Sequence, residues 1–394
     1  MTKPNTSAPP PRRLSWHDPG VRSIIYQVIA VGFIGAIVWF LVQNTLHNLS
    51  VRNISTGFGF LSREAGFAIG ESVIEYTPAD TYGRAVTVGV MNTLRIALLG
   101  IVLATLLGTL IGIARLSKNW LIKKLASIYV EVMRNIPLLL QLFFWYAVIS
   151  ETMPGPRQAL KPLPGVFISN RGVKVPWFEG DGLTWLFGGL ILAILAVIGL
   201  SRWARKRQEK TGLFFPVYRV GAVLILVLPV ALWLFSGTAL SIDMPELKGF
   251  NFVGGLTLSP EFAALLLGLV IYTSAFIAEV VRSGIQSVGY GQWEAAGALG
   301  LRNGLVLRLI VLPQALRVII PPMTNQYLNL TKNSSLAVAI GYPDLVQVFT
   351  GTVLNQTGQA VEVIAITMLV YLTISLVTSL FMNIYNKRMA LVER

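Results

Sequence analysis

Residues 24–43, IIYQVIAVGFIGAIVWFLVQ, decide the fold class of this chain. The stretch carries no charged side chain, and about twenty helical residues span the roughly 30 Å hydrocarbon core of a bilayer. Further apolar runs lie at 94–114, 130–149, 183–200, 217–235, 260–281 and 361–385, with an eighth inside 316–340. The sequence therefore predicts an all-α integral membrane protein with about eight transmembrane helices.

Composition supports this class. Only 13% of the 394 residues are charged and 54% are hydrophobic, whereas a soluble domain carries about 25% charged residues. The chain lacks cysteine and has two histidines, which excludes disulfides, thiolate metal sites and His-rich metal sites. A soluble enzyme is excluded, and no metal site is predicted.

The distribution of basic residues predicts the orientation. With a cytoplasmic N-terminus, 21 Lys and Arg residues fall in cytoplasmic segments, 10 fall outside, and one lies at a helix end. Cytoplasmic loops are enriched in Lys and Arg, so we expect both termini in the cytoplasm, which requires the eighth span to cross. The net charge of +14 thus orients the spans, and a nucleic-acid partner is not predicted.

The connections differ in character. The first 23 residues are Pro- and Ser-rich, which predicts a disordered tail. The Pro- and Gly-rich segment 150–182 is predicted to be irregular, and Pro137 to kink the third span. Gly108 and Gly112 predict close helix packing.

Two Glu-x-x-Arg pairs end predicted spans, Glu131 with Arg134 and Glu279 with Arg282. The i,i+3 spacing places each pair on one helix face, where opposite charges partly neutralise each other. Each pair is either an interfacial ion pair that eases insertion or a pair that lines or gates a pathway, since ionisable residues near membrane depth usually face a bundle interior.

The cytoplasmic stretch 290–313, YGQWEAAGALGLRNGLVLRLIVLP, predicts a short helix with an exposed small-residue face. Trp293, Ala295, Ala296 and Leu299 can share one face, and Glu294 falls in the first turn, where the helix dipole favours a carboxylate. The pattern fits a docking helix, and equally a helix lying in the membrane interface.

The same stretch resembles the EAA loop of permease subunits of ABC importers. Glu294-Ala295-Ala296, Gly300 and Ile310-x-Leu312-Pro313 meet all the spacings of that motif. The resemblance implies that Glu294 contacts an ATPase subunit, that Gly300 ends the helix, and that Arg302 belongs to the coupling segment.

Further segments resemble the polar amino-acid branch of that family, the histidine and glutamine type. They are MNTLR at 91–95, YVEVMRNIP at 129–137, LPQALR at 312–317 and KNSSL at 332–336. The resemblance implies a five-helix core at 88–150 and 258–388, with a coupling loop at 282–313. The whole layout resembles that of the larger permeases of general L-amino-acid importers. Outside the core it has an added helix and periplasmic loop at 24–87, an insertion with two helices at 151–257 and a cytoplasmic tail at 389–394.

The resemblance also implies partners. No Walker A pattern and no Gly-Lys dipeptide occurs in the sequence, so this chain is expected to be a transport subunit rather than an enzyme, without a cofactor of its own. The implied partners are a dimer of ABC ATPase subunits that uses ATP and Mg, a second homologous permease, and a periplasmic amino-acid-binding protein. The implied location is the bacterial inner membrane.

Polar side chains within the eighth span are the candidates for a substrate pathway. Pro321-Pro322 is expected to break helical hydrogen bonding where backbone lines a cavity, and a polar stripe follows. Its members are Asn325, Gln326, Asn329, Lys332 and Asn333. Amides with a lysine suit both ends of an amino-acid zwitterion, although interhelical hydrogen bonding explains them equally well. Asn92 and Gln141 are weaker candidates.

Two other classes compete with the importer. A secondary transporter or channel for a small polar solute explains eight spans but not the complete EAA spacing. A membrane scaffold does not explain the polar stripe.

Overall fold

The computed structural model describes residues 19–51 and 56–389. Within these ranges seven helices are long and apolar enough to cross a membrane, or eight when one bent helix pair counts as a span. The prediction of about eight membrane helices is confirmed. Most of the predicted tails, at 1–18 and 390–394, lies outside the described residues, but residues 19–23 are helical rather than part of a tail.

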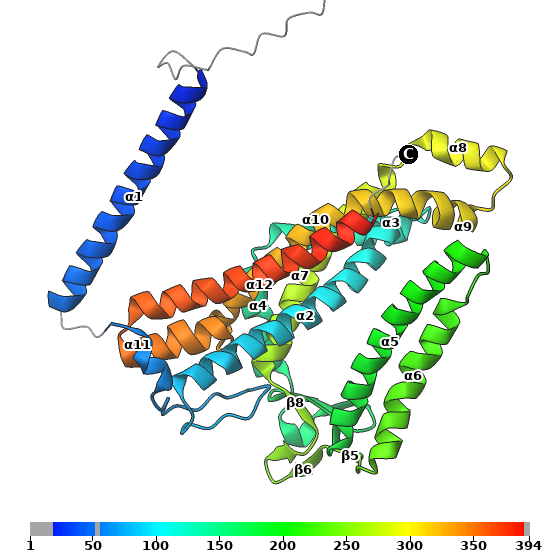
Figure 1. Cartoon of the computed structure of the whole chain (residues 1–394). Helices are drawn as coiled ribbons and strands as arrows, with labels where there is room; N and C mark the ends of the chain where they lie inside the picture. The colour runs from blue at the N-terminus through cyan, green and yellow to red at the C-terminus, as the bar shows by residue number, and fades with distance from the viewer. Residues whose placement is uncertain (1–18, 52–55, 390–394) are drawn as a thin grey trace, which may run out of the picture.

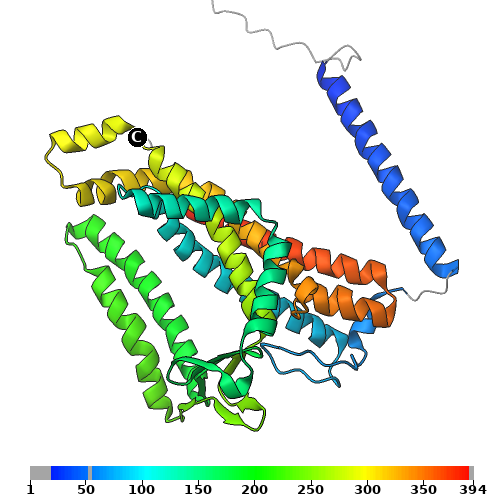
Figure 2. The ribbon, with the colours of Figure 1, turned by 180° about the vertical axis from the view of Figure 1, so that it is seen from behind.

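Helix α1, Pro19–Val51, stands apart from the other helices in Figures 1 and 2. Its most apolar window has no buried residue. A helix that is apolar on every side and uncovered by protein is typical of a segment surrounded by lipid.

The main bundle is built around α7, Pro260–Gln286. It packs against α2 (Tyr82–Ala114), α3 (Trp120–Asn135), α4 (Leu138–Ala147) and α10 (Leu312–Asn333), and α12 (Ala360–Met389) covers α10. A Cβ atom on Gly108 would lie 2.7 Å from the Ile277 side chain, and one on Gly112 would lie 2.8 Å from the Ala278 carbonyl oxygen. The predicted close packing at these glycines is confirmed.

The third predicted span, 130–149, is wrong as a single helix. α3 ends at Asn135 and α4 begins at Leu138, and the two axes differ by 103°. Proline keeps its preceding residue out of helical geometry, and Ile136 is extended at φ −92°, ψ 125°. The kink predicted at Pro137 is therefore a corner. A π-helical turn, Val148–Thr152, prolongs α4.

The eighth predicted span is helical throughout. A four-residue helix α9 (Asn303–Val306) and a π-helical segment (Leu307–Val311) lead into α10, and a 3-10 segment (Ser334–Ile340) follows it. The break expected at Pro321-Pro322 does not occur, since α10 runs through both residues. Proline has a φ angle that suits a helix, and packing against α7 and α12 holds α10 together.

The predicted insertion contains a helical hairpin and eight short strands. α5 (Gly182–Thr211) packs against α6 (Val217–Ser236), and the pair stands away from the main bundle in Figures 1 and 2. The segment 150–182 is not irregular, because its strands pair with those that follow α6: β3 with β8 and β4 with β5. The strands are β1 (Leu160–Leu163), β2 (Val166–Ser169), β3 (Gly172–Val175), β4 (Trp177–Glu179), β5 (Ser241–Asp243), β6 (Glu246–Lys248), β7 (Asn251–Val253) and β8 (Leu256–Leu258).

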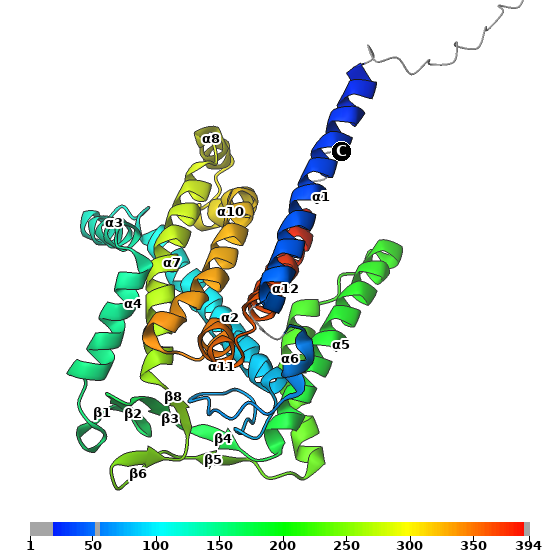
Figure 3. The ribbon, with the colours of Figure 1, turned by 90° about the vertical axis from the view of Figure 1, so that its left-hand side faces the viewer.

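The molecule has two distinct ends. At the strand end lie the strands, a loop with a short 3-10 helix (Phe58–Ser62), and the connection between α10 and α12. That connection holds a π-helical segment (Val346–Val353) and α11 (Leu354–Thr357). At the opposite end lies α8 (Tyr290–Ala298), next to the start of α10 (Figures 1 and 3).

Candidate functional site

Helix α8 is attached to the bundle by one face. Ala296 is buried in the same hydrophobic cluster as Val306 and Ala315, and Trp293 packs against that cluster. Leu299 is 77% exposed. The prediction that Trp293, Ala295, Ala296 and Leu299 share one face is therefore wrong. Trp293 and Ala296, spaced i,i+3, face the bundle, whereas Ala295 and Leu299, spaced i,i+4, are exposed.

The exposed face of α8 carries Glu294 beside Ala295. Glu294 forms no ion pair within the described residues. A carboxylate next to a small and a large apolar side chain, on a helix that the bundle holds from behind, suits contact with another protein.

Gly300 ends α8, as predicted. It has a φ of +69°, a conformation that favours glycine. Its N–H donates to the Gly297 carbonyl at 2.9 Å, and the Leu301 N–H donates to the Ala296 carbonyl at 3.2 Å. These two bonds form a Schellman motif. Arg302 is exposed, and its carbonyl accepts the first bonds of α9.

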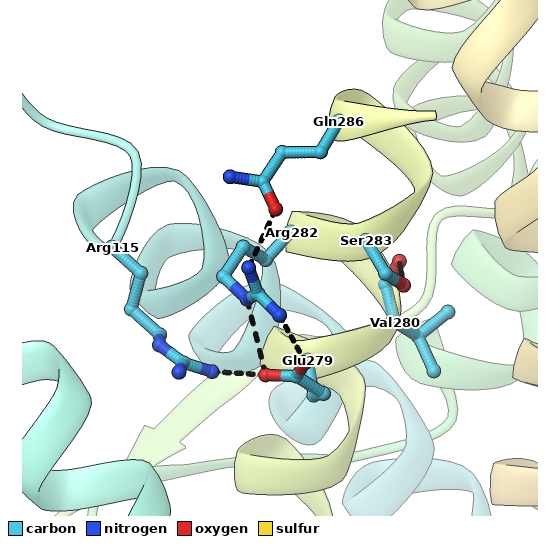
Figure 4. Close-up of polar contacts among 6 residues, drawn as sticks. All are labelled: Arg115, Glu279, Val280, Arg282, Ser283 and Gln286. Atoms are coloured by element: carbon cyan, nitrogen blue, oxygen red, sulfur yellow. Dashed lines mark hydrogen bonds and ion pairs between the residues drawn. The ribbon is translucent and has the colours of Figure 1, made fainter. Parts of the chain in front are cut away.

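A charged network joins α2 to α7 near the α8 end (Figure 4). Glu279 accepts a hydrogen bond from Arg115, the residue after α2, and two from Arg282, at 2.5 Å and 3.2 Å. Arg282 also donates to Gln286 at 2.5 Å. Because Gln286 is the last residue of α7, this network fixes the helix end from which the chain leads into α8.

The other Glu-x-x-Arg sequence is not an ion pair in the structure. No salt bridge joins Glu131 to Arg134 across the described residues. Instead, the Arg134 guanidinium lies 5.1 Å from the centre of the Phe276 ring, and the Asn135 amide donates to the Glu131 backbone carbonyl. The two sequence-related pairs therefore differ in their contacts.

The polar residues of α10 lie on an open face. Three residues of the stripe, Asn325, Asn329 and Lys332, are exposed at i,i+4,i+7 spacing, and Gln326 and Asn333 beside them are half-buried. None of these five side chains has a hydrogen-bond partner in the part of the chain that the structure describes. Within this chain they therefore do not link helices.

Asn92 and Gln141 have structural contacts. The Asn92 amide donates to the Glu71 and Pro343 carbonyls, both at 2.8 Å, and joins two loops at the strand end. The Gln141 amide donates to the Met133 and Ile136 carbonyls, both at 3.0 Å, across the α3–α4 corner. Since both side chains are buried, we assign them to packing rather than to a pathway.

Sequence reasoning did not identify two ionisable groups with extensive contacts. Arg115 is one of the basic residues that orient the spans, and no local sequence pattern links it to Glu279. Asp344 is fully buried and accepts hydrogen bonds from the Gln347 N–H at 2.9 Å and the Tyr371 hydroxyl at 3.2 Å. Burial raises the pKa of the Asp344 carboxyl to about 7. The one sequence signal for Asp344 is that it follows a proline, which is typical of a residue that caps the start of a helix.

Comparison with known proteins gives consistent results. Residues 211–391 match the family "Binding-protein-dependent transport system inner membrane component". The putative amino-acid ABC transporter permease protein YhdX of Escherichia coli is 55% identical over 97% of both chains. The general L-amino acid transport system permease protein AapQ of Rhizobium johnstonii is 50% identical, over 97% of this chain and 96% of the relative. A crystal structure of an amino acid ABC transporter with histidines is 21% identical, with a TM-score of 0.46, over 78% of this chain and 95% of that one.

Proposed function

The chain belongs to the inner membrane permeases of amino-acid ABC transporters, and we propose that it forms half of an L-amino-acid translocation pathway coupled through α8 to a separate ATPase. The predicted family is confirmed by relatives that align over nearly the whole chain. Their family consists of transport subunits of the membrane. We further propose that a dimer of ABC ATPase subunits, using ATP and Mg, and a periplasmic amino-acid-binding protein complete the importer.

The geometry of α8 is the observation that carries the coupling proposal. Its exposed face presents Glu294, Ala295 and Leu299, while Trp293 and Ala296 hold the opposite face against the bundle. A force applied to the exposed face is therefore passed to packed side chains rather than absorbed by a loose loop. We propose that this face binds the ATPase, with Glu294 contacting it directly.

The path from α8 to the membrane helices is short. The Schellman motif at Gly300 directs the chain into α9 and α10. The Arg115–Glu279–Arg282 network ties the preceding helix, α7, to α2. Closure of the ATPase dimer would therefore move α2, α7 and α10 together, which shifts the population between inward-facing and outward-facing states.

The open face of α10 supports a second permease subunit. An uncovered amide or ammonium group at membrane depth is costly unless it meets a partner or water. Asn325, Asn329 and Lys332 gain such an environment when α10 faces a second permease across a water-filled path. We propose that this face lines the path, with the amides and lysine binding the ends of the substrate zwitterion.

We propose that the α8 end is cytoplasmic and that the five core helices are α2, α4, α7, α10 and α12. Both α1 and α12 have their terminal ends on the α8 side in Figure 1, which supports cytoplasmic termini. The helix α1 and the α5–α6 hairpin are then additions to this core.

Copurification tests the coupling proposal. Subunits that copurify with this chain from native membranes in mild detergent would be identified by mass spectrometry, with Glu294→Arg compared to Glu179→Arg. Glu179 is exposed on β4 at the opposite end. We expect a Walker-A ATPase with the wild type and Glu179→Arg, and its loss from Glu294→Arg. An ATPase retained equally by both variants would refute the role of Glu294.

Uptake into proteoliposomes tests the α10 pathway. We expect Asn329→Leu to lower ATP-driven uptake at least tenfold while the ATPase still copurifies, because the substrate loses a hydrogen-bonding group. Thr373→Leu on α12 is the control, since among the described residues the Thr373 hydroxyl donates only to the Leu369 carbonyl of its own helix. Equal uptake by Asn329→Leu and the wild type would contradict this lining.

A further inference from the structure

A groove between α5 and α6 is unused by the proposed function. It has a volume of about 540 Å³ and lies at the end of the hairpin near residues 201–219. Its walls change in character along its length. The part nearer the middle of the hairpin is lined by Val197, Ala222 and Ile225, and the part nearer the turn by Ser201, Arg205 and Gln208, among others.

The turn around this groove is strongly basic. Residues 201–219 hold six basic residues and one acidic residue, Glu209, leaving a net charge of +5. No salt bridge neutralises any of the six within the described residues. One of them, Arg207, has its guanidinium 5.3 Å from the centre of the Trp203 ring. The turn thus presents uncompensated positive charge beside an apolar groove.

Aromatic residues around the groove indicate its level in the bilayer. Phe214 and Tyr218 line it and are 73% and 90% exposed, and Trp203 packs edge-on against Phe215 with ring centres 5.4 Å apart. Tyr and Trp are enriched at the level of lipid headgroups. The apolar run of α5 ends at Leu200, where this aromatic and basic region begins, so we expect the groove to run from the hydrocarbon to the level of the headgroups.

We propose that this groove binds an anionic phospholipid of the surrounding bilayer. The phosphate headgroup lies against Arg205 and Gln208, and an acyl chain runs along Val197, Ala222 and Ile225. The basic wall of the groove suits the anionic headgroup of a phospholipid, and its apolar wall suits an acyl chain. A protein partner would have to cover both the hydrocarbon-facing and the headgroup-facing walls. Basic pockets between membrane helices recognise anionic headgroups in this way. The bound lipid would fill the groove between two helices that otherwise have little protein around them.

Native mass spectrometry of the full chain in detergent tests this site. Phosphatidylglycerol and phosphatidylcholine with identical acyl chains would be titrated separately into delipidated protein. We expect at least fivefold tighter binding of phosphatidylglycerol, the ratio given by about 1 kcal/mol for one basic contact. Equal affinity for the two lipids would overturn the proposal, and so would competition by inorganic phosphate, which would indicate an anion site without a lipid chain.

Three variants separate the groove from diffuse charge. Arg205→Gln and Ala222→Phe should each weaken phosphatidylglycerol binding about fivefold, the first by removing the headgroup contact and the second by filling the groove without changing charge. Lys206→Gln removes the same charge from a residue that does not line the groove and should leave binding within twofold of the wild type. Equal loss in both charge variants with no loss in Ala222→Phe would overturn the proposal, as would a copurifying protein that crosslinks to Tyr218→Cys.

Discussion

Replacing Glu279 with glutamine tests the network that ties α7 to α2. Glu279 accepts one hydrogen bond from Arg115 and two from Arg282, and the Arg115 side chain is only 14% exposed. A glutamine has one acceptor oxygen instead of two, and its NH2 group would face guanidinium N–H donors. A hydrogen bond to a charged group contributes about 1.5–3 kcal/mol, so Glu279→Gln should cost about 2 kcal/mol.

The assay is thermal unfolding of the purified chain in detergent, followed by tryptophan fluorescence. For a protein of this size, about 2 kcal/mol corresponds to a fall in Tm of about 2–3 °C. Glu131→Gln is the matched control, because Glu131 also belongs to a Glu-x-x-Arg sequence but forms no ion pair within the described residues, and its Tm should change by less than about 1 °C. Equal shifts for the two variants would refute the reasoning, as would an unchanged Tm for Glu279→Gln.

Three further predictions concern single positions. Gly300→Ala should lower the stability of the protein by about 1 kcal/mol, because Gly300 has a φ of +69°, and should speed amide hydrogen exchange at the end of α8. Gly297→Ala, inside α8, should slow that exchange, and slowed exchange in both variants would contradict the Schellman motif at Gly300. Gly108→Leu should abolish folded expression because its Cβ would lie 2.7 Å from a side chain of α7, whereas Gly188→Leu, with nothing within 4 Å, should express normally. Asp344, with a pKa of about 7 when folded against an ordinary 3.8, should make stability fall as pH rises from about 4 to 7, and Asp344→Asn should flatten this slope of Tm against pH.

Patterns along the chain predicted the features that depend on local chemistry. The length of the apolar runs predicted the membrane helices, because the thickness of the hydrocarbon core sets the number of residues that a helix needs to cross it. Gly108 and Gly112 predicted a close helix contact, because such a contact depends on the absence of a side chain. The end of α8 at Gly300 was implied by the resemblance to the EAA loop, and a positive φ favours glycine there.

Features that depend on distant segments were not predictable. The contact of Glu279 with Arg115, the residue after α2, depends on how α2 packs against α7, and no comparable basic residue pairs with Glu131 within the described residues. The orientation of Asn92 and Gln141 toward backbone carbonyls depends on how loops and corners pack. The strands beside the α5–α6 hairpin depend on pairing between β3 and β8, which lie on either side of two long helices. A single sequence shows neither contact.

Crosslinking from α8 tests the central claim most directly. The chain has no native cysteine, so a benzophenone probe can be attached at Leu299→Cys on the exposed face of α8, or at Phe235→Cys, 90% exposed near the opposite end. The importer would be isolated in an active state and irradiated. A crosslink to the ATPase subunit from Leu299→Cys and none from Phe235→Cys is the predicted result. An importer that hydrolyses ATP and transports substrate, yet gives no ATPase crosslink from Leu299→Cys, would contradict coupling through α8.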